Sequence, residues 1–125
     1  MSSLLNVHGQ PLSECSCEPL TGWYRDGYCR TGVEDKGLHS VCCVMTTSFL
    51  SYSKAQGNDL IKPMPFHSFP GLKPGDHWCL CASRWMQSYL DGVAPSVILE
   101  STNINTLSII NLELLETYNY RTMFT

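Results

Sequence analysis

Charged residues are scarce in this sequence, at 15% Asp, Glu, Lys and Arg, against about 25% in an average soluble domain. The eight Lys and Arg residues are scattered and the net charge is −3. A nucleic-acid-binding protein needs a cluster of basic residues to neutralise phosphates, so we expect no nucleic-acid partner. The weakly charged surface favours an unknown small molecule or protein as partner and is compatible with a homo-oligomer.

Long apolar runs are also absent. The longest stretch without acidic or basic residues, 37–53, contains many Ser, Thr and Cys residues, so it is too polar to span a bilayer. The first residues lack the basic and apolar regions of a secretory signal. We therefore expect no membrane association and a cytoplasmic location, where the seven cysteines would be free thiols. Their odd number agrees with this expectation.

Several enzyme motifs are missing as well. The sequence contains no GxSxG, HExxH or GxGxxG, and residues 71–76 lack the Walker spacing of a phosphate-binding loop. These absences remove support from large enzyme classes, but they leave open whether the protein is an enzyme.

The turn residues and short apolar runs predict one small α+β domain spanning residues 1–125, with a core at about 6–118 and a short tail at 119–125. We expect a mixed sheet covered by two to three helices, with long ordered loops. Helices are predicted after Thr46 or Thr47, after Ser83 and after Asn111, since each can cap a first helical turn. Strands are predicted at residues 6–12, 40–45, 78–82, 97–99 and 106–110.

Two long motifs resemble those of a known family. The stretches PLTGWYRDGYCRTG (residues 19–32) and FPGLKPGDHWCLCASRW (residues 69–85) are similar to the bacterial family known as domain of unknown function 2237. The resemblance covers residues 6–118 and implies a compact stand-alone domain without an established activity. The cysteines that match the family's motifs are Cys15, Cys29, Cys42, Cys79 and Cys81, whereas Cys17, Cys43 and His77 depart from its pattern.

Cys79 and Cys81 point to one face of a predicted strand. With Cys42 and either His39 or Cys29 they would supply the four ligands of a tetrahedral zinc site. However, the sulfurs of Cys-x-Cys on a straight strand lie about 6–7 Å apart, which is too wide for one metal ion without a bulge. The favoured interpretation is that these cysteines are buried apolar residues, so zinc is not a favoured cofactor.

Cys29 is the candidate for a reactive thiol, because Arg25 and Arg30 would stabilise its thiolate and Asp26 offsets only part of that charge. His39 could act as its base. The alternative, which we favour, is a structural cysteine beneath a glycine-rich loop.

His39 also belongs to a polar cluster with Glu34 and Asp35 that could bind a metal or assist proton transfer. For this cluster, a solvated loop whose acidic residues cap local N–H groups is favoured.

Arg25 and Asp26 follow Trp23 and Tyr24. This order could line a pocket, with an arginine for a carboxylate or phosphate beside aromatic walls. Equally, Arg25 and Asp26 could pair with neighbours and fix the loop.

Three hypotheses for function follow from these residues. The first is a binding module whose pocket or partner surface forms from residues 23–29, residues 63–76 and the strand at 79–81, because function usually resides in loops on a rigid scaffold. Trp78 is a further candidate for ligand binding. The alternatives are a cysteine-dependent enzyme using Cys29 and His39, and a zinc-binding structural domain.

Overall fold

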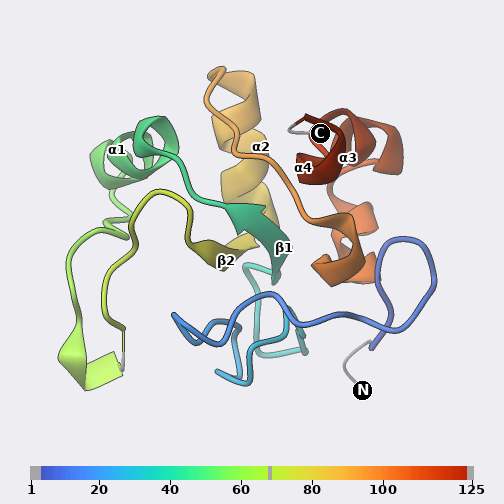
Figure 1. Ribbon diagram of the computed structural model, residues 1–125, viewed down its shortest axis with the longest axis horizontal. Helices are drawn as coiled ribbons and strands as arrows, with labels where there is room; N and C mark the ends of the chain where they lie inside the picture. The colour runs from blue at the N-terminus through green and yellow to red at the C-terminus, as the bar shows by residue number, and fades with distance from the viewer. Residues whose placement is uncertain (1–3, 68, 124–125) are drawn as a thin grey trace.

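A pair of antiparallel strands lies at the centre of the molecule (Figure 1), in a computed structural model that describes residues 4–67 and 69–123. The strands are β1 (His39–Val44) and β2 (His77–Cys81). The α-helices lie on one side of this pair in Figure 1 and the N-terminal segment on the other. The expected α+β class of a single small domain is confirmed, whereas the sheet within the described residues is antiparallel and two-stranded rather than mixed.

The two strands bury both of their faces. Cys42 lies opposite Cys79, and Cys43 lies opposite Trp78. Since side chains alternate along a strand, Cys43 and Trp78 enter the larger core beneath the helices, whereas Cys42 and Cys79 belong to a second, smaller core. The register shifts by a β-bulge between His39 and Val41.

Local capping explains the helices. Thr46 Oγ1 accepts the Phe49 N–H of α1 (Thr47–Ala55) at 3.0 Å, and Asn111 Oδ1 accepts the Leu114 N–H of α3 (Leu112–Thr117) at 2.8 Å. Helix α2 (Ala82–Leu90) follows β2 directly and buries Trp85 completely. In the described part of the chain, no helix is both long and apolar enough to cross a membrane.

Three of the predicted strands are wrong. Residues 6–12 form only isolated bridges, and two 3₁₀ helices occupy Leu99–Ser101 and Ile104–Ser108. Val97 is fully buried beside β1, where it bridges Cys43 and Asn119 without extending a ladder. The apolar run at residues 97–99 therefore reflects burial in the core and not a central strand.

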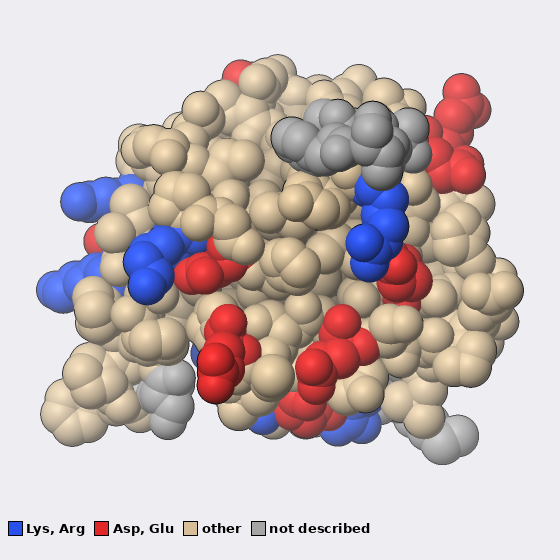
Figure 2. Space-filling model, viewed as in Figure 1, with Lys and Arg blue, Asp and Glu red and all other residues tan. Residues whose placement is uncertain are grey.

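The expected C-terminal tail is partly helical. Helix α4 covers Tyr120–Met123, and residues 124–125 lie outside the described residues. On the face shown in Figure 2, most of the surface is neither acidic nor basic, in keeping with the low content of charged residues.

Two disulfides correct the expectation of seven free thiols. Cys15 is bonded to Cys42, and Cys29 is bonded to Cys79. The bonds form because the N-terminal segment, which lacks helices and strands in its described part, crosses the strand face that carries Cys42 and Cys79. The free cysteines are Cys17, Cys43 and Cys81. The cytoplasmic location stays a prediction.

Candidate functional site

A cavity of about 280 Å³ opens where three segments meet. The glycine-rich loop contributes Gly22, Trp23 and Arg25, and the long connection contributes residues 58–60 together with Met64 and Phe69. The strands contribute His39 and residues 78–81. These are the segments from which the sequence predicts a pocket, with Gly22, His39 and residues 58–60 as additions.

Arg25 projects into this cavity from an unusual backbone conformation. Its φ angle is +54°, in the left-handed region that costs a residue with a side chain about 1–2 kcal/mol. The guanidinium carbon lies 5.2 Å from the centre of the Trp78 ring, and Nη1 donates to the Gly22 carbonyl at 2.7 Å. Burial lowers the pKa of Arg25, since the low-dielectric surroundings disfavour the charged form.

Arg25 forms no ion pair with a carboxylate among the residues described in the structure. Asp26 pairs with Arg30 Nε at 2.7 Å and accepts the Tyr28 N–H. Asp59 lines the same cavity, but its Oδ1 accepts the N–H groups of residues 61 and 62. Asp26 thus pairs with neighbours and fixes the loop. Arg25 lines the cavity and also bonds its own loop at Gly22, so its part in ligand binding stays a prediction.

His39 is held between an aromatic ring and a carboxylate. The rings of Trp23 and His39 are stacked with centroids 5.5 Å apart. His39 Nδ1 lies 2.7 Å from Asp35 Oδ1, and Asp35 is buried, at 2% exposure. In the neutral imidazole with its hydrogen on Nδ1, this N–H donates to the carboxylate and the other ring nitrogen, Nε2, is left as a proton acceptor.

The burial of Asp35 corrects one part of the expectation, that of a solvated residue, whereas the expected capping of a local N–H group is present. Its carboxylate also accepts the His39 N–H at 2.8 Å and the Thr31 hydroxyl at 3.1 Å. These hydrogen bonds satisfy the buried charge and fix the orientation of the imidazole.

Cys81 brings a free, partly exposed thiol to the same cavity. It lies opposite His39 in the strand register and occupies the N-cap position of α2. Its Sγ donates to the Gly37 carbonyl at 2.7 Å and lies 3.1 Å from Ser83 Oγ. A Cβ atom on Gly37 would lie 3.1 Å from Cys81 Sγ and 3.2 Å from His39 Cε1, so the thiol and the imidazole border the same small space.

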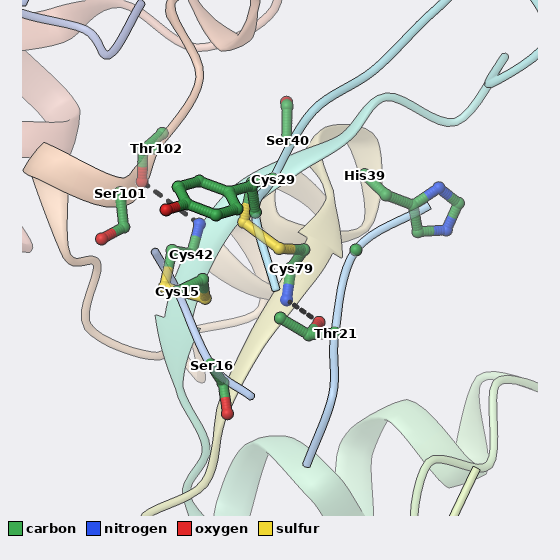
Figure 3. Close-up of a disulfide and its surroundings, with 12 residues drawn as sticks. Cys15, Ser16, Thr21, Cys29, His39, Ser40, Cys42, Cys79, Ser101 and Thr102 are labelled. Carbon is green, nitrogen blue, oxygen red and sulfur yellow. Dashed lines mark hydrogen bonds between the residues drawn. A yellow bond between two sulfur atoms is a disulfide. The ribbon is translucent and has the colours of Figure 1, made fainter. Parts of the chain in front are cut away.

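The remaining cysteine candidates lie in the disulfide pair shown in Figure 3. Hydroxyls of Thr102 and Thr21 accept the N–H groups of Cys42 and Cys79, as the dashed lines mark. The Sγ atoms of Cys15, Cys29 and Cys79 lie within 4.8 Å of one another. In disulfides, however, these sulfurs are not the thiolates that a metal requires.

The structure therefore separates the predicted zinc ligands. Cys29, Cys42 and Cys79 are in disulfides, whereas Cys81 and His39 line the cavity. Cys29 is fully buried and bonded to Cys79, which contradicts the alternative of a reactive thiol and agrees with the favoured interpretation of a structural cysteine.

Tyr24 lies outside the cavity and fixes the loop from its outer side. Its hydroxyl donates to Glu34 Oε1 at 2.7 Å, and the guanidinium carbon of Arg30 lies 4.8 Å from the centre of its ring. The hydrogen bond from Tyr24 lowers the pKa of Glu34.

Sequence reasoning placed Cys81 in a pocket-forming strand and considered it as a zinc ligand or a buried apolar residue, but missed it as a free, partly exposed thiol of the pocket. A usable signal was its position directly before a helix, because reactive thiols often lie at helix N-termini.

The family of uncharacterised proteins conserved in bacteria, DUF2237, matches residues 5–119 of the chain. A search of the curated proteins gives no match.

Proposed function

The chain belongs to the bacterial DUF2237 family, whose description assigns no activity, and we propose that it binds a small carboxylate with a planar group in the cavity beside Trp78. A volume of about 280 Å³ is close to the lower end of ligand pockets, about 300–1,000 Å³. The cavity thus suits a small molecule better than a peptide.

The observation that carries this proposal is the state of Arg25. A left-handed backbone at a residue with a side chain persists only where the surrounding structure enforces it, and such residues gather at ligand sites. Here the conformation brings a guanidinium into the cavity without a carboxylate partner among the described residues. A guanidinium binds a carboxylate through two parallel hydrogen bonds.

The walls of the cavity support a planar ligand. Trp23 and Trp78 line it together with Phe69, and Trp78 is 6% exposed while Trp23 is 43% exposed. Trp78 therefore forms a fixed inner wall and Trp23 the rim. Aromatic rings pair favourably with other flat groups in stacked or edge-to-face arrangements.

The charges of the lining favour one negative charge on the ligand. Arg25 contributes a positive charge and Asp59 a negative one to the same cavity. One carboxylate matches the planar fork of a single guanidinium and leaves no second negative charge to face Asp59. The proposal is therefore a carboxylate.

The test is a titration with benzoate and with its neutral counterpart benzamide, followed by the indole N–H signals of Trp23 and Trp78 in NMR spectra. We expect saturable shifts with benzoate, and a loss of affinity of about tenfold or more in Arg25→Gln. Arg30→Gln is the matched control, because Arg30 pairs with Asp26 and does not line the cavity. Equal shifts with both compounds, or unchanged benzoate binding by Arg25→Gln, would contradict the proposal.

For location, we propose the cytoplasm, because three cysteines keep free thiols that an oxidising compartment tends to pair. The disulfides are compatible with this proposal because their four cysteines are at most 5% exposed, which restricts the access of reductants. Fractionation of the cells tests the location, because the protein should appear in the cytoplasmic fraction. Alkylation in freshly opened cells, before this fractionation, tests whether the three thiols are free there.

A further inference from the structure

The proposed binding cavity contains a thiol, an imidazole and a buried carboxylate that ligand binding alone does not require. Cys81 and His39 line the cavity, and Asp35 lies behind His39 with its carboxylate 2.7 Å from Nδ1. A nucleophile, a base and a group that orients the base form the arrangement used in covalent catalysis. The inference drawn from it rests on the proposed binding function.

The thiol and the imidazole are brought together by the strand pairing. Directly opposite residues on antiparallel strands have Cβ atoms about 4.5–5.5 Å apart, and His39 and Cys81 are such a pair. The bulge after His39 and the lack of a side chain at Gly37 leave both groups facing one small space. Rotation about the Cα–Cβ bond of Cys81 would release the thiol proton from the Gly37 carbonyl and turn the thiol through the space that it shares with the His39 ring.

Helix α2 supplies the electrostatic part of the site. Cys81 is the N-cap residue of this nine-residue helix, and its side chain makes no capping hydrogen bond. The N–H groups of a first helical turn lack intrahelical acceptors and favour negative charge. They can stabilise both a thiolate at Cys81 and the oxyanion that forms when a carbonyl carbon is attacked. Ser83 Oγ, 3.1 Å from Sγ, adds a donor.

We propose that Cys81 is the nucleophile of an acyl-transfer site whose substrates are small esters or thioesters carrying a carboxylate. His39 takes the thiol proton, the Cys81 Sγ–carbon bond forms, and the bond from carbon to the leaving oxygen or sulfur breaks. The proton passes from His39 to the leaving alcohol or thiol. Water then hydrolyses the enzyme thioester, with His39 again as base, and restores the thiol. No electrons are exchanged with an oxidant or reductant.

Arg25 sets the substrate class in this proposal. It lines the same cavity as Cys81, so it would bind the substrate's carboxylate while the acyl carbon lies at Sγ. Asp35 does not reach the substrate in this arrangement, because it is 2% exposed and lies behind the imidazole. Asp35 is therefore a positioning residue.

The test compares two esters with the same leaving group, mono-para-nitrophenyl succinate and neutral para-nitrophenyl acetate, in the full-length protein. Each rate is first corrected for the release of nitrophenolate without protein, which is fast for the succinate ester because its own carboxylate attacks the acyl carbon, and is then divided by the corrected rate of that ester with free cysteine. We expect a burst of nitrophenolate with the succinate ester, a succinyl group on Cys81 in peptide mass spectra, and a normalised preference for it of about tenfold or more.

Three variants assign the roles. Cys81→Ala should abolish the burst, whereas Cys17→Ala, which removes an exposed free thiol outside this cavity, should leave it unchanged. Arg25→Gln should slow the succinate ester while the acetate ester stays within about twofold, since only the former has a carboxylate. His39→Gln should slow both esters.

Two outcomes would overturn the inference: acylation of Cys17 before Cys81, or equal normalised rates for the two esters. Benzoate binding by Cys81→Ala separates this inference from the proposed function. If the variant binds benzoate and the wild-type protein forms no acyl adduct, the nucleophile is refuted and binding stands. If neither protein binds benzoate, the proposed function fails as well.

Discussion

Of the two disulfides, the one between Cys29 and Cys79 closes the longer loop and should contribute more to the free energy of unfolding. Its removal tests this expectation. The perturbation is the double variant Cys29→Ala, Cys79→Ala, purified without reductant so that the other disulfide stays closed. Both side chains are buried, at 0% and 2% exposure. The bond joins the glycine-rich loop to β2 across a sequence separation of 50 residues.

The magnitude follows from the entropy of closing a loop in the unfolded chain. For a separation of 50 residues, this term is about 4 kcal/mol at room temperature. The separation of 27 residues between Cys15 and Cys42 gives about 3.5 kcal/mol. The two loops overlap in sequence, so the terms do not simply add. Since a domain is stable by only about 5–15 kcal/mol, loss of either bond is a large perturbation.

Urea unfolding, followed by tryptophan fluorescence without reductant, measures this effect. With a slope of about 1.5 kcal/mol per molar urea, a loss of about 4 kcal/mol lowers the midpoint by about 2–3 M. The slope itself should rise, because the less constrained unfolded chain exposes more surface. Cys17→Ala is the control and should change stability by less than about 0.5 kcal/mol. A loss below about 1 kcal/mol in the double variant would refute the reasoning.

Three further predictions follow from individual contacts. Alkylation of the unfolded, unreduced protein should modify three cysteines, and Cys43 should stay unmodified in the native state because burial raises its pKa; mass spectrometry counts the adducts. Tyr24→Phe should raise the pKa of Glu34 towards its ordinary value, since the Tyr24 hydrogen bond lowers this pKa; carbon-detected NMR measures it. The stability that this bond contributes is present above the pKa of Glu34 in the unfolded chain and is lost as the pH falls through its pKa in the folded protein; unfolding at several pH values measures this loss. Gly22→Ala should destabilise more than Gly57→Ala, because both have positive φ but only a Cβ on Gly22 would meet a backbone oxygen, at 2.4 Å; the two thermal midpoints test the order.

The starts of α1 and α3 and the two strands could be predicted because their signals are local, whereas the expected cap at Ser83 is wrong, since Ser83 lies inside α2 and Cys81 is its N-cap. Thr46 and Asn111 each cap a helix as expected, since a hydroxyl or amide oxygen needs to reach only the N–H a few residues ahead. Short apolar runs of β-compatible residues likewise identified β1 and β2. In contrast, the apolar run around Val97 was mistaken for a central strand, because full burial inside a small core gives the same pattern.

The candidate site depended on contacts that span the chain, and these could be predicted only in part. The loops that line the cavity could be chosen from their content of Trp, Arg and Gly. The partners of the cysteines could not, since Cys29 bonds to a residue 50 positions away. The pairing of His39 with Cys81 depends on the register and bulge of the strands, which no local pattern in the sequence specifies.

The backbone strain around the cavity links stability to the proposed binding. The residues other than glycine with positive φ in the described part of the chain are Arg25 and Leu38, and they border the cavity or directly precede its His39. Strain of this kind costs about 1–3 kcal/mol per residue, which the cross-link from Cys29 to β2 can offset. The matched variants Arg25→Ala and Arg25→Gly isolate it, because both remove the side chain and only glycine adopts the left-handed conformation freely. We expect Arg25→Gly to be the more stable of the two by about 1 kcal/mol in urea unfolding, with neither binding benzoate. If Arg25→Ala is the more stable variant, the loop does not hold Arg25 in the left-handed conformation, and the strain argument for the site falls with it.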